Sequence, residues 1–203
     1  MLALIMAGGR GTRLRMGEKP PLVTICGRPM LSYVTDAFTA AGHEVVVVAS
    51  YRTPFTKNWC RAQGGVGLYE AEGGLGYIED INAAAADLEE EGTPFFTCVS
   101  DLPPCLAPDI VTAVEDAWRR AGTPACSTWV PPRDLCEEHG CRTRYTEAVD
   151  GIPACPAGIN ILTAGDSGAA QDELQLLLRD RRLAFNVNTR EELALVQKYL
   201  CRK

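Results

Sequence analysis

The stretch LALIMAGGRGTRLRMGEKPPL, residues 2–22, decides the fold. It begins with six apolar residues, as expected of a strand that is buried on both faces of a parallel sheet. Glycines and basic side chains then follow closely: Gly8, Gly9, Arg10, Gly11, Arg13, Arg15 and Lys19. Glycine tolerates positive φ, so successive backbone N–H groups can point into a concavity that also carries positive charge. The stretch therefore predicts a phosphate-binding turn.

Two common phosphate-binding motifs do not fit this turn. A Walker loop needs GxxxxGK followed by Ser or Thr, and no such run occurs. A dinucleotide fingerprint starting at Gly9 would need its third glycine at position 14, which is Leu14. The next apolar run, residues 44–50, also ends without a carboxylate for a ribose, which argues against NAD. An arginine-rich surface turn is the simpler alternative, and the glycines directly after a buried strand disfavour it.

Composition limits the remaining options. A chain of 203 residues is long enough for one α/β domain, residues 1–203, with a substantial core. A net charge of -6 argues against nucleic-acid partners and anionic membrane surfaces. No apolar run approaches the roughly 18 residues of a membrane span, and no signal peptide is recognisable, so we expect a cytoplasmic protein.

Nine cysteines occur without a CxxC pair, and free thiols are the expectation in a cytoplasmic chain. One group, Cys136, His139, Cys141 and Cys155, contains four potential zinc ligands. Its spacing matches no common zinc finger, and an ordinary loop is the alternative.

Apolar runs alternate with helical patterns along the chain, which predicts an α/β fold with a mostly parallel sheet between two helical layers. Strands are expected at residues 2–7, 44–50, 66–69, 93–100, 125–130, 156–163 and 183–187, with a short apolar stretch at residues 22–25 and a hairpin around Asp150-Gly151. Helices are expected at residues 29–41, 53–63, 77–91, 108–121, 172–179 and 189–200. Ligands of such folds bind at the carboxyl ends of the strands.

Two further features belong to that edge. A second glycine-rich turn, residues 72–77, could let a flat base approach the backbone, although a plain helix entry explains the glycines equally well. Asp101 ends a predicted central strand, where its carboxylate could bind Mg²⁺; a turn or cap aspartate is the alternative. Asn160, in the run PAGINILT, could add an amide oxygen. Together these features predict a nucleoside triphosphate site.

The reaction that suits such a site is in-line attack at the α-phosphorus with pyrophosphate as the leaving group. It depends on positioning and charge neutralisation, which Arg10, Arg13, Lys19 and a metal could supply. A phosphate monoester nucleophile is already ionised at neutral pH and needs no general base. The absence of a convincing catalytic histidine agrees with this chemistry.

Several segments sharpen the assignment: AGGRGTR (7–13), Lys19-Pro20, GYIEDIN (76–82), PAGIN (156–160) and FNVNT (185–189). Together they resemble the archaeal GTP:adenosylcobinamide-phosphate guanylyltransferases, a branch of the MobA-like NTP transferases. The resemblance implies a Rossmann-like nucleotidyltransferase fold, with GTP and a phosphorylated corrinoid as substrates and Mg²⁺ as cofactor. The implied reaction is transfer of GMP to adenosylcobinamide phosphate in cobalamin biosynthesis.

The resemblance also implies residue roles. The triphosphate would be bound by Ala7, Gly8, Gly9, Arg10, Gly11, Thr12, Arg13 and Lys19. Gly74, Gly76 and Tyr77 would lie near guanine, and Asp101 and Asn160 would serve the metal. Asn186 and Asn188 would position the acceptor or its loop. Arg13, Lys19 and Asp101 are the predicted catalytic residues.

Two other functions remain open at this point. A molybdenum-cofactor guanylyl- or cytidylyltransferase would share the AGGxGTR and NxNT elements, whereas GYIEDIN favours the corrinoid branch. A non-catalytic GTP-binding regulator would have little need of Asp101 and Lys19. The oligomeric state is undetermined, with a homodimer among the options.

Overall fold

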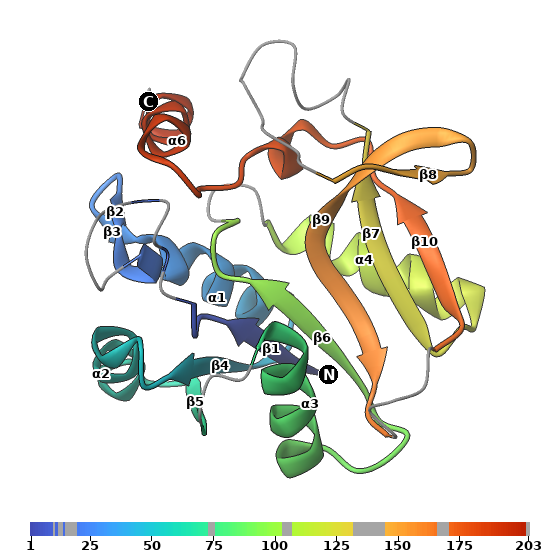
Figure 1. Cartoon of the computed structure of the whole chain (residues 1–203), viewed down its shortest axis with the longest axis horizontal. Helices are drawn as coiled ribbons and strands as arrows, with labels where there is room; N and C mark the ends of the chain where they lie inside the picture. Colours follow the sequence, from blue (N-terminus) through green and yellow to red (C-terminus); the bar gives the residue numbers. More distant parts are fainter. Residues whose placement is uncertain are drawn as a thin grey trace.

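The structure, a computed structural model, describes residues 1–9, 11, 14, 20–72, 76–102, 107–131, 145–165 and 171–201. Within this part, a twisted central sheet has the strand order β10-β7-β9-β6-β1-β4-β5, and β8 pairs with β9 (Figure 1). The predicted α/β class with a mostly parallel sheet is confirmed.

One half of the sheet is parallel and built around the first strand. Its members are β1 (Leu2–Met6), β4 (Glu44–Ser50), β5 (Gly67–Ala71) and β6 (Pro94–Val99). All five residues of β1 are buried, because β4 and β6 flank it and helices cover both of its faces. The continuous apolar runs of β1 and β4 are explained by this position. The turns after β1, β4 and β6 therefore meet at one edge.

The other half contains an antiparallel strand. Its members are β7 (Ala125–Val130), β8 (Glu147–Val149), β9 (Ile152–Thr163) and β10 (Glu173–Leu177). The long strand β9 runs antiparallel to β6, β7 and β8. Asp150 and Gly151 join β8 to β9 with φ values of 50° and 76°, which confirms the predicted hairpin.

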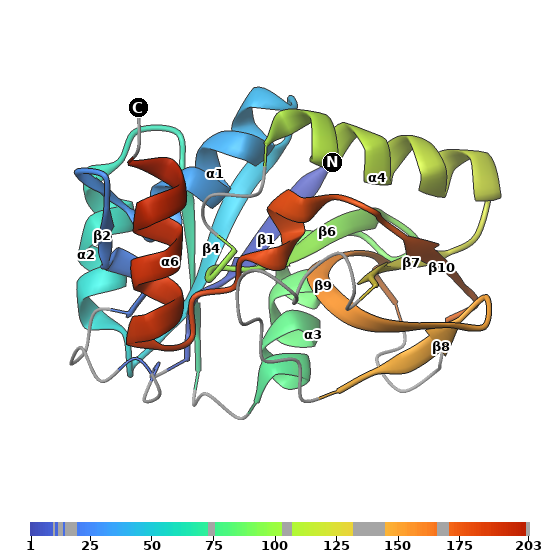
Figure 2. The same cartoon turned by 90° about the horizontal axis from the view of Figure 1, so that it is seen from above.

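Helices lie on both faces of the sheet (Figure 2). The helices that follow the predicted order are α1 (Met30–Ala40), α2 (Pro54–Ala62), α3 (Tyr77–Leu88) and α4 (Pro108–Ala121). The larger core lies on the face of α1 and α4 and includes Ile5, Phe38 and Val114. A smaller core between the sheet and α3 includes Leu4 and Ala84. The three-layer arrangement is therefore confirmed, with α3 covering only part of its face.

The C-terminal segment returns to the first hairpin. It comprises the 3₁₀ helix η2 (Arg181–Ala184) and α6 (Arg190–Leu200). The hairpin, β2 (Thr24–Ile25) and β3 (Arg28–Pro29), follows the 3₁₀ helix η1 (Pro20–Leu22). Thr189 and Glu192 form a capping box that starts α6. Leu193 and Val196 of α6 are buried and belong to the larger core.

Free thiols were the wrong expectation for two cysteines. Cys26, in the turn between β2 and β3, forms a disulfide with Cys201 at the end of α6, with 5.6 Å between the Cα atoms. The two residues are 175 positions apart, so sequence spacing gave no indication of the pair. Cys60, Cys98, Cys126 and Cys155 are buried free thiols, as expected.

Two elements near the C-terminus differ from prediction. Residues 172–179, expected to be helical, contain β10, which pairs in parallel with β7. Alternate leucines of β10, Leu174 and Leu176, pack against the larger core, so tertiary pairing overrides helix propensity. Residues 183–187, expected to be a strand, contain the end of η2 and an irregular connection to α6. In the part of the chain that the structure describes, no helix is both long and apolar enough to cross a membrane.

Candidate nucleotide site

The carboxyl ends of β6, β1 and β4 lie next to one another in that order. Each is followed by a turn that contributes to one cavity: Ser100 and Asp101 after β6, Gly8 and Gly9 after β1, and Arg52 after β4. The cavity has a volume of about 380 Å³. Its remaining described lining is Met6, Ala7, Gly11, Leu14, Pro21, Met30, Gly76, Tyr77, Asp80, Val99, Val187 and Asn188. The cavity therefore lies at the carboxyl ends of the strands, the edge at which the sequence predicts a ligand site.

The glycine turn is attached to the neighbouring strand. The N–H of Ala7 donates to the carbonyl of Val48 at 2.8 Å, and the hydroxyl of Ser50 donates to the carbonyl of Gly8 at 2.8 Å. A Cβ at Gly8 would lie 3.4 Å from Cβ of Ser50. Gly11 adopts a φ of 53°, the positive φ that the glycine-rich sequence predicts for this turn. The two hydrogen bonds thus fix the start of this turn relative to β4.

The N-terminus of α3 forms one wall of the cavity. Gly76 precedes the helix, and Tyr77 and Asp80 project from its first turn into the lining. Tyr77 is 43% exposed as a whole, but desolvation of its phenol group raises its pKa to about 12, with a smaller contribution from the charge of Asp101. Tyr77 therefore stays a neutral phenol near neutral pH and can donate a hydrogen bond.

Asp101 lies in the turn after β6, on the other side of the glycine turn from Arg52. Its Oδ1 atom is buried, and its backbone carbonyl accepts a hydrogen bond from the N–H of Val187 at 2.8 Å. This bond joins the turn after β6 to the C-terminal segment. Gly158 on β9 allows the close approach beneath, because a Cβ there would lie 2.7 Å from Cγ2 of Val99 and 3.3 Å from Cδ1 of Leu102. The missing side chain at Gly158 therefore lets β9 pack closely against the end of β6.

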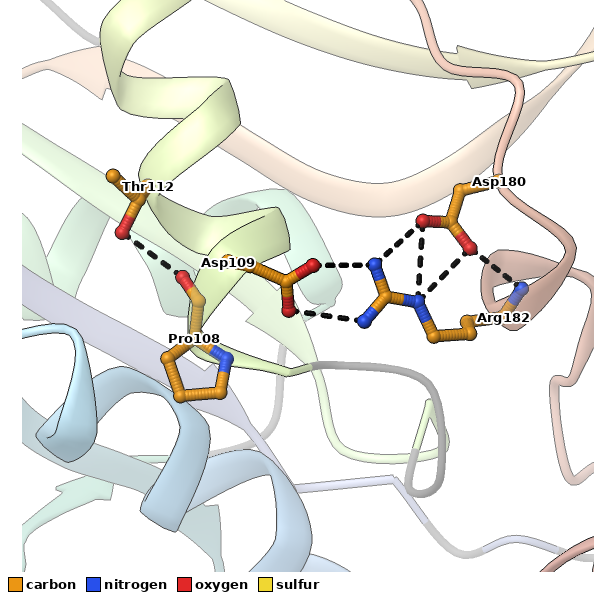
Figure 3. Close-up of polar contacts among 5 residues, drawn as sticks. All are labelled: Pro108, Asp109, Thr112, Asp180 and Arg182. Carbon is orange, nitrogen blue, oxygen red and sulfur yellow. Dashed lines mark hydrogen bonds and ion pairs between the residues drawn. The ribbon is translucent and has the colours of Figure 1, made fainter.

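An ion-pair cluster anchors the C-terminal segment to α4 (Figure 3). The guanidinium of Arg182 donates to Asp109 at 2.6 and 2.9 Å and to Asp180 at 2.7, 3.0 and 3.1 Å. These bonds hold the pKa of both carboxyls below the usual range. A planar guanidinium can bridge two carboxylates in this way, whereas an ammonium presents no such fork. The cluster fixes η2 before the chain reaches the cavity.

Asn186 and Asn188 follow that anchor. The amide of Asn188 donates to the side-chain oxygen of Asn186, and Asn188 lines the cavity. The backbone N–H of Asn188 donates to Glu192 at 2.8 Å, which ties the residue to the start of α6. The structure therefore brings the FNVNT segment to the predicted edge, although it comes from the far end of the chain.

Asn160 occupies a different place. It lies within β9, opposite Thr97 of β6 and Ser127 of β7, and its Oδ1 accepts a hydrogen bond from the N–H of Thr128 at 3.3 Å. Among the described residues, Asn160 is not part of the cavity lining. Of the predicted metal pair, Asp101 lines the cavity and Asn160 does not.

Several predicted residues lie outside the described part of the chain: Arg10, Thr12, Arg13, Lys19 and Gly74. The same holds for Cys136, His139 and Cys141 of the candidate zinc group, whereas Cys155 is a buried thiol in β9. No cluster of three or more potential metal-binding side chains occurs among the residues described.

Two charged residues of the cavity were not identified from the sequence as site residues. Asp80 belongs to the quoted GYIEDIN segment, but its orientation depends on the rotation of α3. Arg52 follows β4, and nothing in the sequence distinguished it from other surface arginines. The signal that could have found Arg52 is its position directly after a central parallel strand.

Comparisons with known proteins agree with the geometry. Residues 3–184 match the MobA-like NTP transferase domain. The chain is 30% identical over 211 residues to adenosylcobinamide-phosphate guanylyltransferase of Methanocaldococcus jannaschii, covering 98% of this chain and 97% of that protein. It is 35% identical to mannose-1-phosphate guanyltransferase of Eremothecium gossypii over 112 residues, which is 50% of this chain and 31% of that one.

The fold also matches a solved structure. HddC from Yersinia pseudotuberculosis superposes with a TM-score of 0.73 at 15% identity, covering 98% of both chains.

Proposed function

This chain belongs to the MobA-like NTP transferase family, and we propose that it transfers GMP from GTP to the phosphate of adenosylcobinamide phosphate. The products are adenosylcobinamide-GDP and pyrophosphate. The observation that carries the proposal is the match over 98% of this chain to an adenosylcobinamide-phosphate guanylyltransferase. The cavity supports it, because one hollow joins the glycine turn to Asp101.

The cavity residues suit a displacement at phosphorus. An oxygen of the acceptor phosphate attacks the α-phosphorus of GTP, the bond to the bridging oxygen between the α- and β-phosphates breaks, and pyrophosphate leaves. No proton has to be removed from the nucleophile, because a phosphate monoester is ionised at neutral pH. The task of the protein is therefore to position the reactants and to neutralise negative charge.

The glycine turn is proposed to bind the phosphates of GTP. The backbone of Gly8, Gly9 and Gly11 lines the cavity, and a side chain at Gly8 would contact Ser50. Backbone N–H groups that converge in such a turn bind anions without long side chains. From the sequence we propose that Arg10, Thr12, Arg13 and Lys19 add charge and hydrogen bonds to the same phosphates.

Asp101 fits a divalent cation. Its carboxylate is a hard oxygen ligand in the cavity lining, and its Oδ1 atom is shielded from bulk water. Magnesium sites in nucleotide enzymes commonly use one or two carboxylates and complete the coordination with phosphate oxygens and water. Asp101 would hold Mg²⁺ in that manner, and the ion would offset charge on the phosphates. The hydrogen bond from Val187 orients the turn that carries this carboxylate.

The test is a nucleotide titration followed by a turnover assay. Purified protein is titrated with GTP, ATP and CTP in the presence of Mg²⁺, and pyrophosphate release is then measured with and without adenosylcobinamide phosphate. We expect binding of GTP and release of pyrophosphate that requires the corrinoid. Activity with molybdopterin as acceptor and none with the corrinoid would replace the proposal with a molybdenum-cofactor nucleotidyltransferase. Binding of GTP without turnover of either acceptor would indicate a regulator.

A further inference from the structure

The end of the cavity opposite Asp101 carries its own charged groups. The turns of the edge follow the strand order β6, β1, β4, so Asp101 and Arg52 stand on either side of the glycine turn. The strands that precede them, β6 and β4, are two interstrand spacings apart, or about 10 Å. If Asp101 and the glycine turn serve the triphosphate, the nucleoside extends toward Arg52. The wall at that end is the first turn of α3, with Gly76 and Asp80.

Asp80 is held in place there by the backbone. Its N–H donates to the carbonyl of Gly76 at 3.0 Å, and the residue is partly buried. Its carboxylate makes no hydrogen bond and no ion pair with any residue that the structure describes. Burial, and then the like charge of Glu79, raise the pKa of Asp80, whereas the charge of Arg52 lowers it. A carboxylate so placed offers two acceptor oxygens to a ligand in the cavity.

Arg52 is positioned by its neighbours Tyr51 and Ser50. Its Nε donates to the hydroxyl of Tyr51 at 2.9 Å, and the guanidinium carbon lies 5.1 Å from the centre of the Tyr51 ring. Its backbone N–H donates to the hydroxyl of Ser50 at 3.1 Å. With respect to the described residues, these contacts leave the two terminal amino groups of the guanidinium available as donors. The far end of the cavity thus presents acceptors from one element and donors from another.

Guanine has the complementary pattern. Its N1–H and N2 amino group are adjacent donors, and O6 and N7 are acceptors on the neighbouring edge; arginine is the usual partner of O6 and N7. Adenine places an acceptor at N1 and a donor at N6, which would set N1 against a carboxylate. We propose that Asp80 accepts hydrogen bonds from N1–H and the N2 amino group while Arg52 donates to O6 and N7, so that this pair selects guanine. The assignment rests on the proposed use of GTP and explains that choice of nucleotide.

Xanthosine triphosphate provides a direct test. Xanthine carries a carbonyl at C2 in place of the amino group, so it presents an acceptor where guanine presents a donor. An amide at position 80 can donate to that carbonyl and still accept from N1–H. The experiment measures the dissociation constants of GTP, ITP and XTP for the wild type and for Asp80→Asn. Asp87→Asn is the matched control, because Asp87 is on the same helix and is not among the described residues that line the cavity.

We expect the wild type to prefer GTP over XTP by about 10- to 100-fold, the discrimination of one bidentate pair. ITP, which lacks the N2 amino group, should bind more weakly than GTP. Asp80→Asn should lose GTP affinity by a similar factor and gain affinity for XTP, whereas Asp87→Asn should keep the wild-type order. Tighter XTP binding by the variant would also show that it is folded. Arg52→Ala should weaken GTP, ITP and XTP alike, since all three carry O6 and N7.

The possible failures are distinguishable. If the wild type binds and turns over GTP but Asp80→Asn keeps the wild-type preference for GTP over XTP, the guanine assignment is overturned and the proposed function stands. Equal affinity of the wild type for GTP and ATP would overturn it in the same way. If the wild type does not bind GTP in the presence of Mg²⁺, the proposed function fails and this assignment fails with it.

Discussion

Replacing Gly158 by alanine tests how the turn that carries Asp101 is supported. Gly158 has a φ of +83°, and a Cβ at this position would lie 2.7 Å from Cγ2 of Val99. The left-handed conformation costs an L-residue about 1–2 kcal/mol. Forcing an extra carbon into a filled space costs a further ~1–3 kcal/mol. We therefore expect Gly158→Ala to lower the free energy of unfolding by about 2–5 kcal/mol in urea denaturation.

Gly122 supplies the control for the conformational part. It ends α4 with a φ of +69°, and a Cβ there would meet nothing within 4 Å. Gly122→Ala should therefore cost only the ~1–2 kcal/mol of the left-handed conformation. In a Val99→Ala background, which removes the closest contact, the cost of Gly158→Ala should fall toward that of Gly122→Ala, with Cδ1 of Leu102 at 3.3 Å as the remaining close contact.

The same variants have a catalytic readout. Val99 lines the cavity two residues before Asp101, so a displacement of Val99 should move the carboxylate. Gly158→Ala should reduce the rate at saturating GTP below that of Gly122→Ala, measured by pyrophosphate release. Equal free energies of unfolding for the two alanine variants would refute the packing argument, because it would show that β9 and the end of β6 can separate without cost.

Three other predictions follow from the geometry. Asp101→Ala should lower transfer by at least ~100-fold while GTP affinity falls modestly, as for loss of a key electrostatic group, and equal losses in both would contradict the metal role. Reduction of the disulfide between Cys26 and Cys201, which links residues 175 positions apart, should lower the free energy of unfolding by up to about 5 kcal/mol. The Cys201→Ser variant should have a urea midpoint that dithiothreitol does not change. Burial lowers the pKa of His43 despite Glu115 Oε2 at 3.4 Å from its Nε2. As the pH falls, His43 is protonated in the unfolded state before it is protonated in the folded state, so its contribution to stability is complete above the unfolded pKa of 6.5 and declines below it. In His43→Gln the free energy of unfolding should therefore fall less steeply with decreasing pH than in the wild type. Identical slopes for the two proteins would refute this role of His43.

Sequence reasoning worked where local pattern and final environment agree. The run EVVVVAS became β4 with unchanged bounds, and Pro108 and Gly122 delimit α4 as the helix start and stop signals indicated. Asp101 and the first glycines reached the same edge because parallel strands on neighbouring positions must end together.

Sequence reasoning failed where contacts with a distant part of the chain decide the conformation of a segment. The segment ELQLL has good helix formers, yet β7 offers an open edge and the core accepts alternate leucines, so it forms β10. The segment around Leu183 becomes 3₁₀ because Asp180 accepts from the N–H of Arg182 and closes the turn. The orientation of Asp80 and the partner of Cys26 likewise depend on elements far away in the sequence, which no local pattern encodes.

The apolar floor of the cavity has a consequence for mutational screens. Leu14 and Met30 line the cavity and are also core residues, each 1% exposed. Truncating either side chain removes packing from the domain and reshapes the lining of the cavity in the same step. In a library scored only by growth or turnover, such positions would rank beside the charged residues, although they carry no reactive group. Separating the two classes requires scoring the amount of folded protein in every clone.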